Sequence, residues 1–347
     1  MRKVKWGVIG AGGIADRRTI PGLLQAPACE LCALMDIARV EELEAKYGVR
    51  CHRNESDLLA HPGLEAVYIA TPVCLHKEQI VRAARAGKHV LVEKPLCRTV
   101  PEAEEAVDVC RSAGVLLQEG YMMRFHGGHR RIFELIGDGA LGRPVYARAQ
   151  LACWYPRIQG AWRQDPQAGG GGALIDMASH LYDLLEMFLG PVVRVAALAG
   201  TQVQEYPVDD SATTLLQFES GCHATIDTFY CVPDDASRTR LEIYGDKGSI
   251  LAEGTIGQGS GGSIEIHRER AGRGYQALQA KDASAPFEPV EFDKVNPYTA
   301  ECESFARSIL GGRRQVEASS GEHGLHILKV VEAAYRSAAT GRFETIA

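Results

Sequence analysis

The sequence VIGAGGIA at residues 8–15 has the pattern G-x-G-x-x-A and directly follows a predicted first strand, Lys5–Gly10. Gly10 permits a tight turn, Gly12 lets a ligand approach the backbone, and the small side chain of Ala15 lets the next helix pack on the strand. The N-terminus of that helix offers backbone N–H groups to phosphates. Because the motif opens a strand–helix–strand order, it indicates a dinucleotide-binding fold rather than only a glycine-rich turn.

An acid stands where such a fold needs one. Asp36 ends the second predicted strand, Leu31–Asp36. A carboxylate there accepts hydrogen bonds from the adenosine ribose hydroxyls and repels a 2′-phosphate. Ile37 follows it, so the sequence favours NAD over NADP, although Arg39 is close enough to bind a 2′-phosphate. The same carboxylate can also cap the following helix, and the two functions are compatible.

The first 120 residues alternate short apolar runs with amphipathic stretches, which indicates a parallel, doubly wound sheet. Gly48, Gly87 and Gly114 follow the helical stretches, where a left-handed residue ends a helix. Pro21 predicts that the first helix is short or kinked. The further predicted strands are Ala66–Ile69, His89–Glu93 and Val115–Glu119, and the predicted helices are Ile37–Tyr47, Lys77–Ala86 and Val100–Ala113.

The pattern changes near residue 125, where longer segments of alternating character begin. They predict a second domain with an antiparallel or mixed open sheet, so we expect a Rossmann domain over residues 1–123 and an α/β domain over residues 124–347. The predicted strands are Val145–Trp154, Val192–Leu198, Ala212–Phe218, His223–Phe229, Arg240–Tyr244, Ser249–Glu253 and Ser263–His267, and the predicted helices are Gly128–Ile136, Leu174–Leu189, Tyr298–Leu310 and Gly324–Thr340.

Composition excludes several classes of partner. The chain has 347 residues, 46% hydrophobic and 24% charged, with a formal net charge of −6. No apolar run approaches the ~20 residues that span a bilayer, and the basic residues are scattered, so we expect neither a membrane nor a nucleic acid as partner. The ten cysteines follow no disulfide framework, which is typical of a reducing, cytoplasmic compartment.

Three residue pairs imitate metal motifs. Cys29 and Cys32 form C-x-x-C at the entry of a predicted strand, where residues three apart point to opposite faces. The H-x-x-H pairs His126/His129 and His323/His326 have no cysteine or carboxylate placed beside them in sequence. We therefore interpret all three pairs as structural and expect no metal site.

Two stretches place reactive side chains at the ends of elements. Lys94 follows the strand His89–Glu93, and the carboxyl ends of parallel strands face the ligand crevice. A lysine there can stabilise an alkoxide, although by itself it is more simply a surface lysine. Asp176 and His180 are four residues apart and share one face of a helix. A neutral histidine can accept a hydroxyl proton as hydride leaves the same carbon; the alternative is a histidine paired with Asp183.

Together these motifs resemble the glucose–fructose oxidoreductase / inositol dehydrogenase (Gfo/Idh/MocA) family. They occur in the family's order and span nearly the whole chain. The matching stretches are G-x-G-x-x-A at 10–15, Ala70-Thr71-Pro72 with His76, Gly87–Val90 leading into Glu93-Lys94-Pro95, Trp162-Arg163, the glycine run 169–172 leading to Asp176 with His180, and Ala334–Ser337. Cys74 and Ala178 depart from the pattern, where asparagine and glycine are frequent, and bear on substrate fit.

The resemblance implies a Rossmann domain followed by an α/β domain whose open, mostly antiparallel sheet mediates homodimers or homotetramers. It implies a Lys–Asp–His active site, which maps to Lys94, Asp176 and His180, and a cis bond between Lys94 and Pro95. The expected cofactor contacts are Gly10, Gly12, Gly13, Ile14, Asp36, Ile37, Thr71, Pro72, His76, Glu93, Lys94, Trp162 and Arg163. The expected substrate contacts are Lys94, Arg124, Tyr155, Arg157, Asp176 and His180.

The function expected from this resemblance is NAD-dependent interconversion of a secondary alcohol and a ketone on a sugar, sugar acid or cyclitol. In this hypothesis His180 is the general base, Lys94 steadies charge on the reacting oxygen, and Asp176 orients the substrate or tunes Lys94. Two alternatives stay open on the same scaffold: a glycosidase that uses bound NAD without net redox change, and a catalytically silent dinucleotide-binding regulator. The intact set of three residues argues against the silent protein.

Overall fold

The computed structural model describes residues 2–269, 286–312 and 319–346, and within them the first sheet has six parallel strands. Their order, β3-β2-β1-β4-β5-β6, is that of a doubly wound sheet, as predicted. All four residues of β4 are buried, which is expected for a central parallel strand covered on both faces. The strands are β1 (Val4–Ile9), β2 (Cys29–Met35), β3 (Arg50–His52), β4 (Ala66–Ile69), β5 (His89–Glu93) and β6 (Leu117–Gly120).

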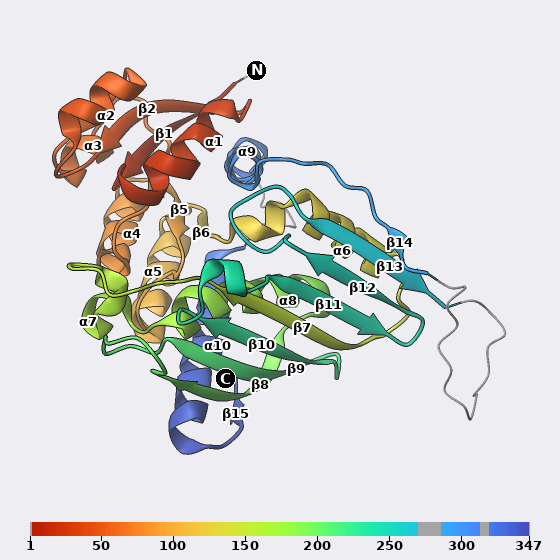
Figure 1. The fold of residues 1–347 in the computed structure, drawn as a ribbon. Coiled ribbons are helices and arrows are strands. Elements are labelled where there is room, and N and C mark those ends of the chain that lie inside the picture. Colours follow the sequence, from red (N-terminus) through yellow and green to blue (C-terminus); the bar gives the residue numbers. More distant parts are fainter. Residues whose placement is uncertain (1, 270–285, 313–318, 347) are drawn as a thin grey trace, which may run out of the picture.

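Helices connect these strands (Figure 1). Gly48, Gly87 and Gly114 have positive φ values at the ends of helical stretches, as predicted. The first helix is interrupted: a π-helical segment runs into a short α-helix with Pro21 in its first turn. The elements are η1 (Ala15–Thr19), α1 (Ile20–Gln25), α2 (Val40–Tyr47), α3 (Glu55–Leu59), η2 (Val73–Leu75), α4 (His76–Arg85), α5 (Val100–Ser112) and η3 (Met122–Phe125).

Within the described ranges, nine strands form the second sheet, in the order β14-β13-β12-β11-β7-β10-β9-β8-β15. The pairing of β10 with β7 is parallel and the other pairings are antiparallel, which confirms the predicted open, mostly antiparallel sheet. The strands are β7 (Pro144–Ala152), β8 (Val192–Gly200), β9 (Ser211–Phe218), β10 (His223–Phe229), β11 (Arg240–Gly245), β12 (Gly248–Glu253), β13 (Ser263–Arg268), β14 (Glu288–Pro289) and β15 (Glu344–Thr345).

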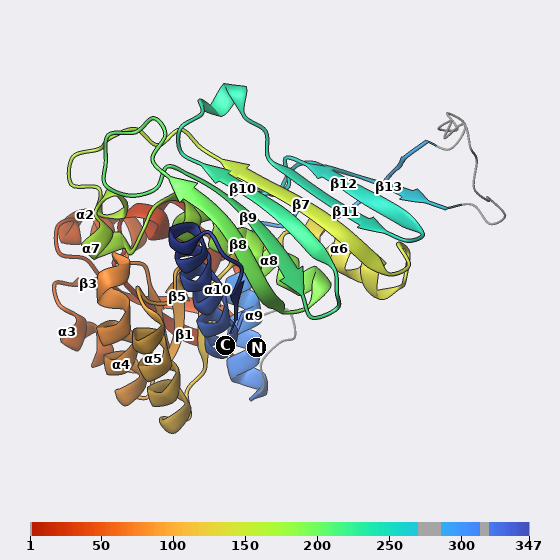
Figure 2. The same cartoon turned by 90° about the horizontal axis from the view of Figure 1, so that it is seen from below.

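Helices α6, α8 and α10 lie on one face of this sheet, and the described part of the chain leaves the other face without an α-helix (Figure 2). Burial alternates along β9 accordingly, with every second side chain exposed. The expected helix Leu174–Leu189 is π-helical over its first turn. The elements are α6 (Gly127–Gly137), η4 (Trp162–Gln164), α7 (Pro166–Gly169), η5 (Leu174–Ala178), α8 (Ser179–Leu189), η6 (Asp234–Ala236) and α10 (Gly321–Thr340).

Helix α9 (Pro297–Gly311) returns to the first sheet. Its residues Cys302 and Phe305 join the buried core around Trp6, and the ring centroids of Trp6 and Phe305 lie 5.5 Å apart. The chain therefore crosses between the two sheets more than once, and the division at residues 123 and 124 stays a proposal. Residues 270–285 and 313–318 of the expected second domain lie outside the described residues. In the part that is described, no helix is both long and apolar enough to cross a bilayer.

Candidate active site

The glycine-rich turn after β1 has the geometry that a dinucleotide needs. Gly10 has φ +80°, and a Cβ there would lie 2.8 Å from a side-chain carbon of Thr71. Gly13, with φ +53°, faces open space, because a Cβ built on it would meet no atom of the described residues within 4 Å. Ala15 is fully buried where η1 packs against the sheet. The first N–H groups of a helix have no acceptor within it, so this turn fits a diphosphate.

Asp36 links that turn to the next helix. Its Oδ2 accepts a hydrogen bond from the N–H of Gly12 at 3.1 Å, and its Oδ1 accepts from the N–H groups of Ala38 and Arg39, each at 2.9 Å. The carboxylate therefore closes the turn before α2 and lies against the fingerprint loop. It is not the N-cap of the helix, because α2 begins at Val40 with Arg39 as its N-cap residue, and its contact with the ribose stays a prediction. Ile37 is 79% exposed and packs little.

His76 holds the loops that follow β4 and β5. Its Nδ1 and Nε2 lie 2.9 Å from the carbonyl oxygens of Pro95 and Thr71, respectively, and the side chain is 1% exposed. Burial lowers the pKa of His76, and hydrogen bonds to the backbone of Thr71, Pro95 and Leu96 act against that shift. His76 therefore ties the backbone at Thr71 to that at Pro95, and its contact with a cofactor stays a prediction.

Four charged or polar side chains meet at the carboxyl end of β5. Lys94 Nζ lies 2.5 Å from Asp176 Oδ1 and donates to the Asp176 carbonyl oxygen at 2.7 Å. Arg163 Nε donates to the same Oδ1 at 3.1 Å, and the Tyr230 hydroxyl donates to Oδ2. The Lys94–Pro95 bond is cis, as the resemblance implied. Asp176 comes from η5 and Lys94 from the end of β5, so the cluster joins the two sheets.

Charge pairing dominates this cluster. Burial alone would raise the pKa of Asp176, but the positive charges of Lys94 and Arg163 outweigh burial and hold that pKa well below its usual range. Asp176 is therefore a carboxylate at every physiological pH. An anion held by two cations cannot itself serve as a base, but it fixes the lysine ammonium group in place.

His180 completes the group that the sequence predicted. It lies on α8, one turn after Asp176, and is 7% exposed. Burial, reinforced by the positive charge of Lys94, lowers the pKa of His180 well below its ordinary value. Its Nδ1 has no hydrogen-bond partner within the described residues, and the ring of Tyr121 packs edge-on at 5.5 Å between centroids. Burial and the positive charge of Lys94 thus favour the neutral imidazole of His180, the form in which a ring nitrogen can accept a proton.

Glu93 and Trp162 lie at the edges of the cluster. The Tyr68 hydroxyl donates to Glu93, and burial raises the pKa of that carboxyl. The guanidinium carbon of Arg163 lies 4.2 Å from the ring centroid of Trp162, so the Trp162-Arg163 pair stacks while Arg163 reaches Asp176. The contacts of these residues with a cofactor stay predictions.

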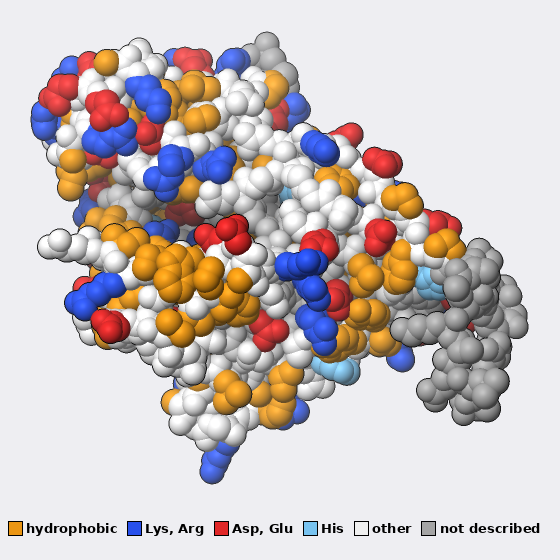
Figure 3. All heavy atoms as spheres, in the orientation of Figure 1, with side chains coloured by type: hydrophobic (Ala, Val, Ile, Leu, Met, Phe, Trp, Pro, Cys, Tyr) orange, Lys and Arg blue, Asp and Glu red, His pale blue; other side chains and the backbone are white. Residues whose placement is uncertain are grey.

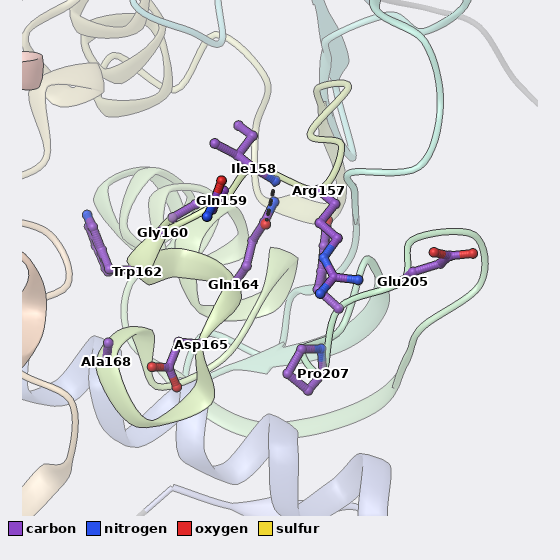
Figure 4. A pocket seen from close by; sticks show the side chains of 12 residues that line it. Arg157, Ile158, Gln159, Gly160, Trp162, Gln164, Asp165, Ala168, Glu205 and Pro207 are labelled. Atoms are coloured by element: carbon purple, nitrogen blue, oxygen red, sulfur yellow. Dashed lines mark hydrogen bonds between the residues drawn. The ribbon is translucent and has the colours of Figure 1, made fainter.

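Tyr155 and Arg157 lie on the loop that leads to η4. The Tyr155 ring is 5.0 Å from that of Tyr230, so it packs beside the cluster. Arg157 is exposed and lines a surface hollow together with Ile158, Gln164, Glu205 and Pro207 (Figure 4). Figure 4 also shows Trp162 at the edge of this hollow, apart from Arg157. Figure 3 shows a further hollow where the two lobes of the molecule meet.

The structure does not bring Arg124 into contact with this cluster. Its Nε donates to Asp183 Oδ1 at 2.7 Å, and its Nη2 lies 2.8 Å from His323 Nε2. The residue is 6% exposed, on η3. Arg124 therefore neutralises a buried carboxylate, and a contact with substrate stays a prediction. Asp183 pairs with Arg124 and His323, not with His180.

Two polar residues near the cluster were not predicted. Tyr230 follows β10, and no sequence motif marks it as a partner of Asp176. Glu119 lies in β6, and burial together with the negative charge of Asp183 raises the pKa of Glu119 to about 8. The rule that strand ends face the ligand crevice could have drawn attention to Glu119.

The pairs that imitate metal motifs have structural partners. Cys29 Sγ contacts the carbonyl oxygen of Cys302, and Cys32 Sγ contacts that of Trp6, so the two thiols point to different neighbours. His129 Nδ1 lies 2.8 Å from the carbonyl oxygen of Met123. Across the described residues, no group of three or more His, Cys, Asp or Glu side chains is placed to hold a metal ion.

Comparison with known proteins gives matches to both halves of the chain. The family model described as "Oxidoreductase family, NAD-binding Rossmann fold" matches residues 4–121, and that of the "GFO/IDH/MocA C-terminal domain" matches residues 129–251. The 1,5-anhydro-D-fructose reductase of Ensifer adhaerens is 30% identical over 345 residues, which cover 97% of each chain. The D-xylose 1-dehydrogenase (NADP(+)) 2 of Haloferax volcanii is 28% identical over 97% of this chain and 98% of its own.

Solved structures share the whole fold. The aldose-aldose oxidoreductase of Caulobacter crescentus, crystallised with glycerol, superimposes with a TM-score of 0.86 at 26% identity. The match covers 99% of this chain and 100% of that one. Both sheets therefore have counterparts in a single known protein.

Proposed function

The chain belongs to the Gfo/Idh/MocA family of oxidoreductases, and on that premise we propose that it is an NAD-dependent dehydrogenase for a secondary alcohol carbon of a sugar, sugar acid or cyclitol. The observation that carries the proposal is the cluster of Lys94, Asp176 and His180 at the carboxyl end of β5. Relatives named for sugar reduction and sugar oxidation support the substrate class.

Each residue of the cluster has one task in this proposal. His180, neutral because it is buried beside Lys94, takes the proton of the substrate hydroxyl during oxidation. Lys94 donates a hydrogen bond to the same oxygen and stabilises the charge that develops there. Asp176 holds the ammonium group of Lys94 at 2.5 Å and so fixes the direction in which it donates. Bound NAD would supply the hydride acceptor at its nicotinamide ring.

The cofactor would lie across the glycine-rich turn. Gly10, Gly12, Gly13 and Ile14 would approach the diphosphate, and Asp36 would accept hydrogen bonds from the adenosine ribose. We propose NAD rather than NADP because of that carboxylate. The relatives do not decide the matter, since one family model is described as NAD-binding and the Haloferax volcanii relative is named for NADP(+).

The rest of the proposal follows the family. The remaining expected cofactor contacts are Ile37, Thr71, Pro72, His76, Glu93, Lys94, Trp162 and Arg163, and Tyr155, Arg157 and Arg124 are the expected further substrate contacts. We also propose a homodimer or homotetramer that covers the helix-free face of the second sheet, and a location in the cytoplasm.

The test is NADH absorbance at 340 nm while sugars, sugar acids and cyclitols are offered with NAD and, separately, with NADP. The proposal expects absorbance to rise with NAD and at least one polyol. A parallel assay measures sugar released from aryl glycosides. Release of sugar without net formation of NADH would contradict the dehydrogenase function and would support the redox-neutral glycosidase. No reaction in either assay, with NAD still bound to the protein, would favour the silent binder.

A further inference from the structure

Arg39 reaches back over the fingerprint loop from the start of α2. Its Nη1 lies 4.0 Å from the position that a Cβ on Gly12 would occupy, and Asp36 Oδ2 lies 3.1 Å from the same position. The guanidinium and the Asp36 carboxylate therefore flank the same stretch of backbone. In a fold of this type the adenosine ribose lies beside that carboxylate. A 2′-phosphate on the ribose would consequently meet Arg39.

Two other carboxylates already hold this guanidinium. Arg39 Nη2 lies 3.0 Å from Asp16 Oδ2, and its Nε donates to Glu42 Oε2 at 2.9 Å, with a second contact between Nη2 and Glu42 Oε1. The side chain of Asp16 is 10% exposed and that of Glu42 is 60% exposed. The pair with Asp16 is the better shielded of the two, because solvent screens exposed charges.

Asp16 is itself fixed in place by other residues. Lys46 Nζ and the Tyr47 hydroxyl both donate to its Oδ1 at 2.7 Å. Burial would raise the pKa of Asp16, but the hydrogen bonds from Lys46, Tyr47 and Arg39 outweigh burial and lower the pKa to about 2. Asp16 is therefore charged at every pH at which the protein functions, and it lies in η1, directly behind the glycine-rich turn.

We propose that Asp16, together with Glu42, binds the guanidinium of Arg39 and so keeps the chain selective for NAD, the dinucleotide that lacks a 2′-phosphate. This inference rests on the proposed dinucleotide site and adds the residues that decide between the two cofactors. Arg39 alone would favour NADP, because a guanidinium binds phosphate through paired hydrogen bonds. Asp16 and Glu42 already bind the Nε and Nη2 groups of Arg39. The guanidinium therefore cannot offer a 2′-phosphate a pair of hydrogen bonds that includes these groups without losing one of these contacts.

The local charge balance supports this assignment. Asp16, Asp36 and Glu42 carry three negative charges, whereas Arg39 and Lys46 carry two positive charges, so the cluster has a net charge of −1. Figure 3 shows acidic and basic side chains interleaved over α2 and its neighbours. A 2′-phosphate would enter a region of net negative charge and would have to displace carboxylates from Arg39.

The test measures the dissociation constants of NADH and NADPH by nicotinamide fluorescence, without any substrate. In Asp16→Asn we expect NADPH to bind roughly ten-fold more tightly than in the parent, and the NADH constant to change far less. The gain should disappear in the double variant Asp16→Asn/Arg39→Ala. It should persist in Asp16→Asn/Lys46→Ala, because Lys46 is not the phosphate ligand in this account.

Asp108→Asn serves as the matched control, since it removes an aspartate paired with Arg111 on the exposed surface of α5; its NADPH-to-NADH ratio should equal that of the parent. Should Asp16→Asn fail to fold by circular dichroism, Glu42→Gln replaces it, with an expected gain of roughly three-fold.

An unchanged ratio in a folded variant, or a gain that survives removal of Arg39, would overturn the inference while leaving the dehydrogenase proposal intact. A parent protein that binds neither NADH nor NADPH would overturn the proposed function itself, and this inference with it.

Discussion

Replacing Asp176 by asparagine tests whether the cluster at the end of β5 is held by charge. The change keeps the side-chain volume and removes one negative charge. Lys94 Nζ at 2.5 Å and Arg163 Nε at 3.1 Å then lose the carboxylate that they share. The side chain of Lys94 is 9% exposed, so its ammonium group would stay largely buried beside a neutral amide.

The expected loss of stability follows from this burial. Removing one partner of a buried ion pair costs about 3–5 kcal/mol, because the remaining charge stays uncompensated. The side chain of Arg163 is 34% exposed and can reach solvent, so we expect the lower part of that range, about 3 kcal/mol. At roughly 1.4 °C per kcal/mol for a chain of this size, the midpoint of thermal unfolding should fall by about 4 °C.

The effect should depend on pH in a defined direction. The charges of Lys94 and Arg163 overcome burial and depress the pKa of Asp176 in the folded protein. A carboxylate whose folded pKa is depressed contributes stability above its unfolded pKa of about 3.9 and loses it as the pH falls towards the folded pKa. The difference between parent and Asp176→Asn should therefore be the same at pH 7 and pH 5, and should shrink below about pH 4.

Circular dichroism during thermal and urea unfolding at pH 7 and pH 5 measures this difference. Asp108→Asn, which breaks an exposed pair with Arg111, is the control and should change stability by less than about 0.5 kcal/mol. An Asp176→Asn protein as stable as the parent at pH 7 would refute the argument that this carboxylate compensates the buried Lys94 and the partly exposed Arg163.

Three further predictions concern the site and the loop that supports it. His180→Ala should lower turnover by roughly 100-fold, measured by NADH absorbance with the substrate found in the panel, while NADH fluorescence shows cofactor binding unchanged. Tyr230→Phe removes one hydrogen bond to the Asp176 carboxylate and should lower kcat by roughly ten-fold in the same assay. Gly172→Ala should lower the thermal midpoint by an amount that corresponds to about 1–3 kcal/mol, because its Cβ would collide with the carbonyl oxygen of Asp209.

Separate results would contradict each of these three. Full turnover in His180→Ala would remove His180 as the base, and full activity in Tyr230→Phe would mean that its hydroxyl does not help to position Asp176. Gly137→Ala is the control for Gly172→Ala, since a Cβ there meets no described atom within 4 Å. Equal stability of the two glycine variants would show that the loop at Gly172 can shift freely.

The alternation of strands and helices was predictable because local rules govern it. Short apolar runs located most strands of the first sheet, and segments of alternating character located most strands of the second. Glycines after the helical stretches marked where helices end. Strand β3 and helix α3 were missed, because β3 spans only Arg50–His52 and has no pattern long enough to detect. Helix α9 was expected as a helix, but its packing against Trp6 in the first sheet is a contact over almost the whole chain length that no local rule contains.

The site was predictable only to the level of its motifs. Lys94 and His180 were found because strand ends and helical spacing point to one crevice. Tyr230 was not found, because its contact with Asp176 depends on how β10 packs against η5. The pairing of Asp16 with Arg39 was also missed, since it joins η1 to the start of α2 across the fingerprint loop. Such contacts depend on tertiary packing rather than on sequence spacing.

Transfer of hydride itself is measured most directly with NADH that carries deuterium at C4 of its nicotinamide. The 4R and 4S forms would each be incubated with the protein and a panel of keto sugars and ketocyclitols, and the products analysed by mass spectrometry. We predict one deuterium on the new alcohol carbon of at least one product, from one of the two forms, and formation of that product roughly 100-fold more slowly in His180→Ala. Products without deuterium, or sugar released with no deuterium gained, would contradict the dehydrogenase account.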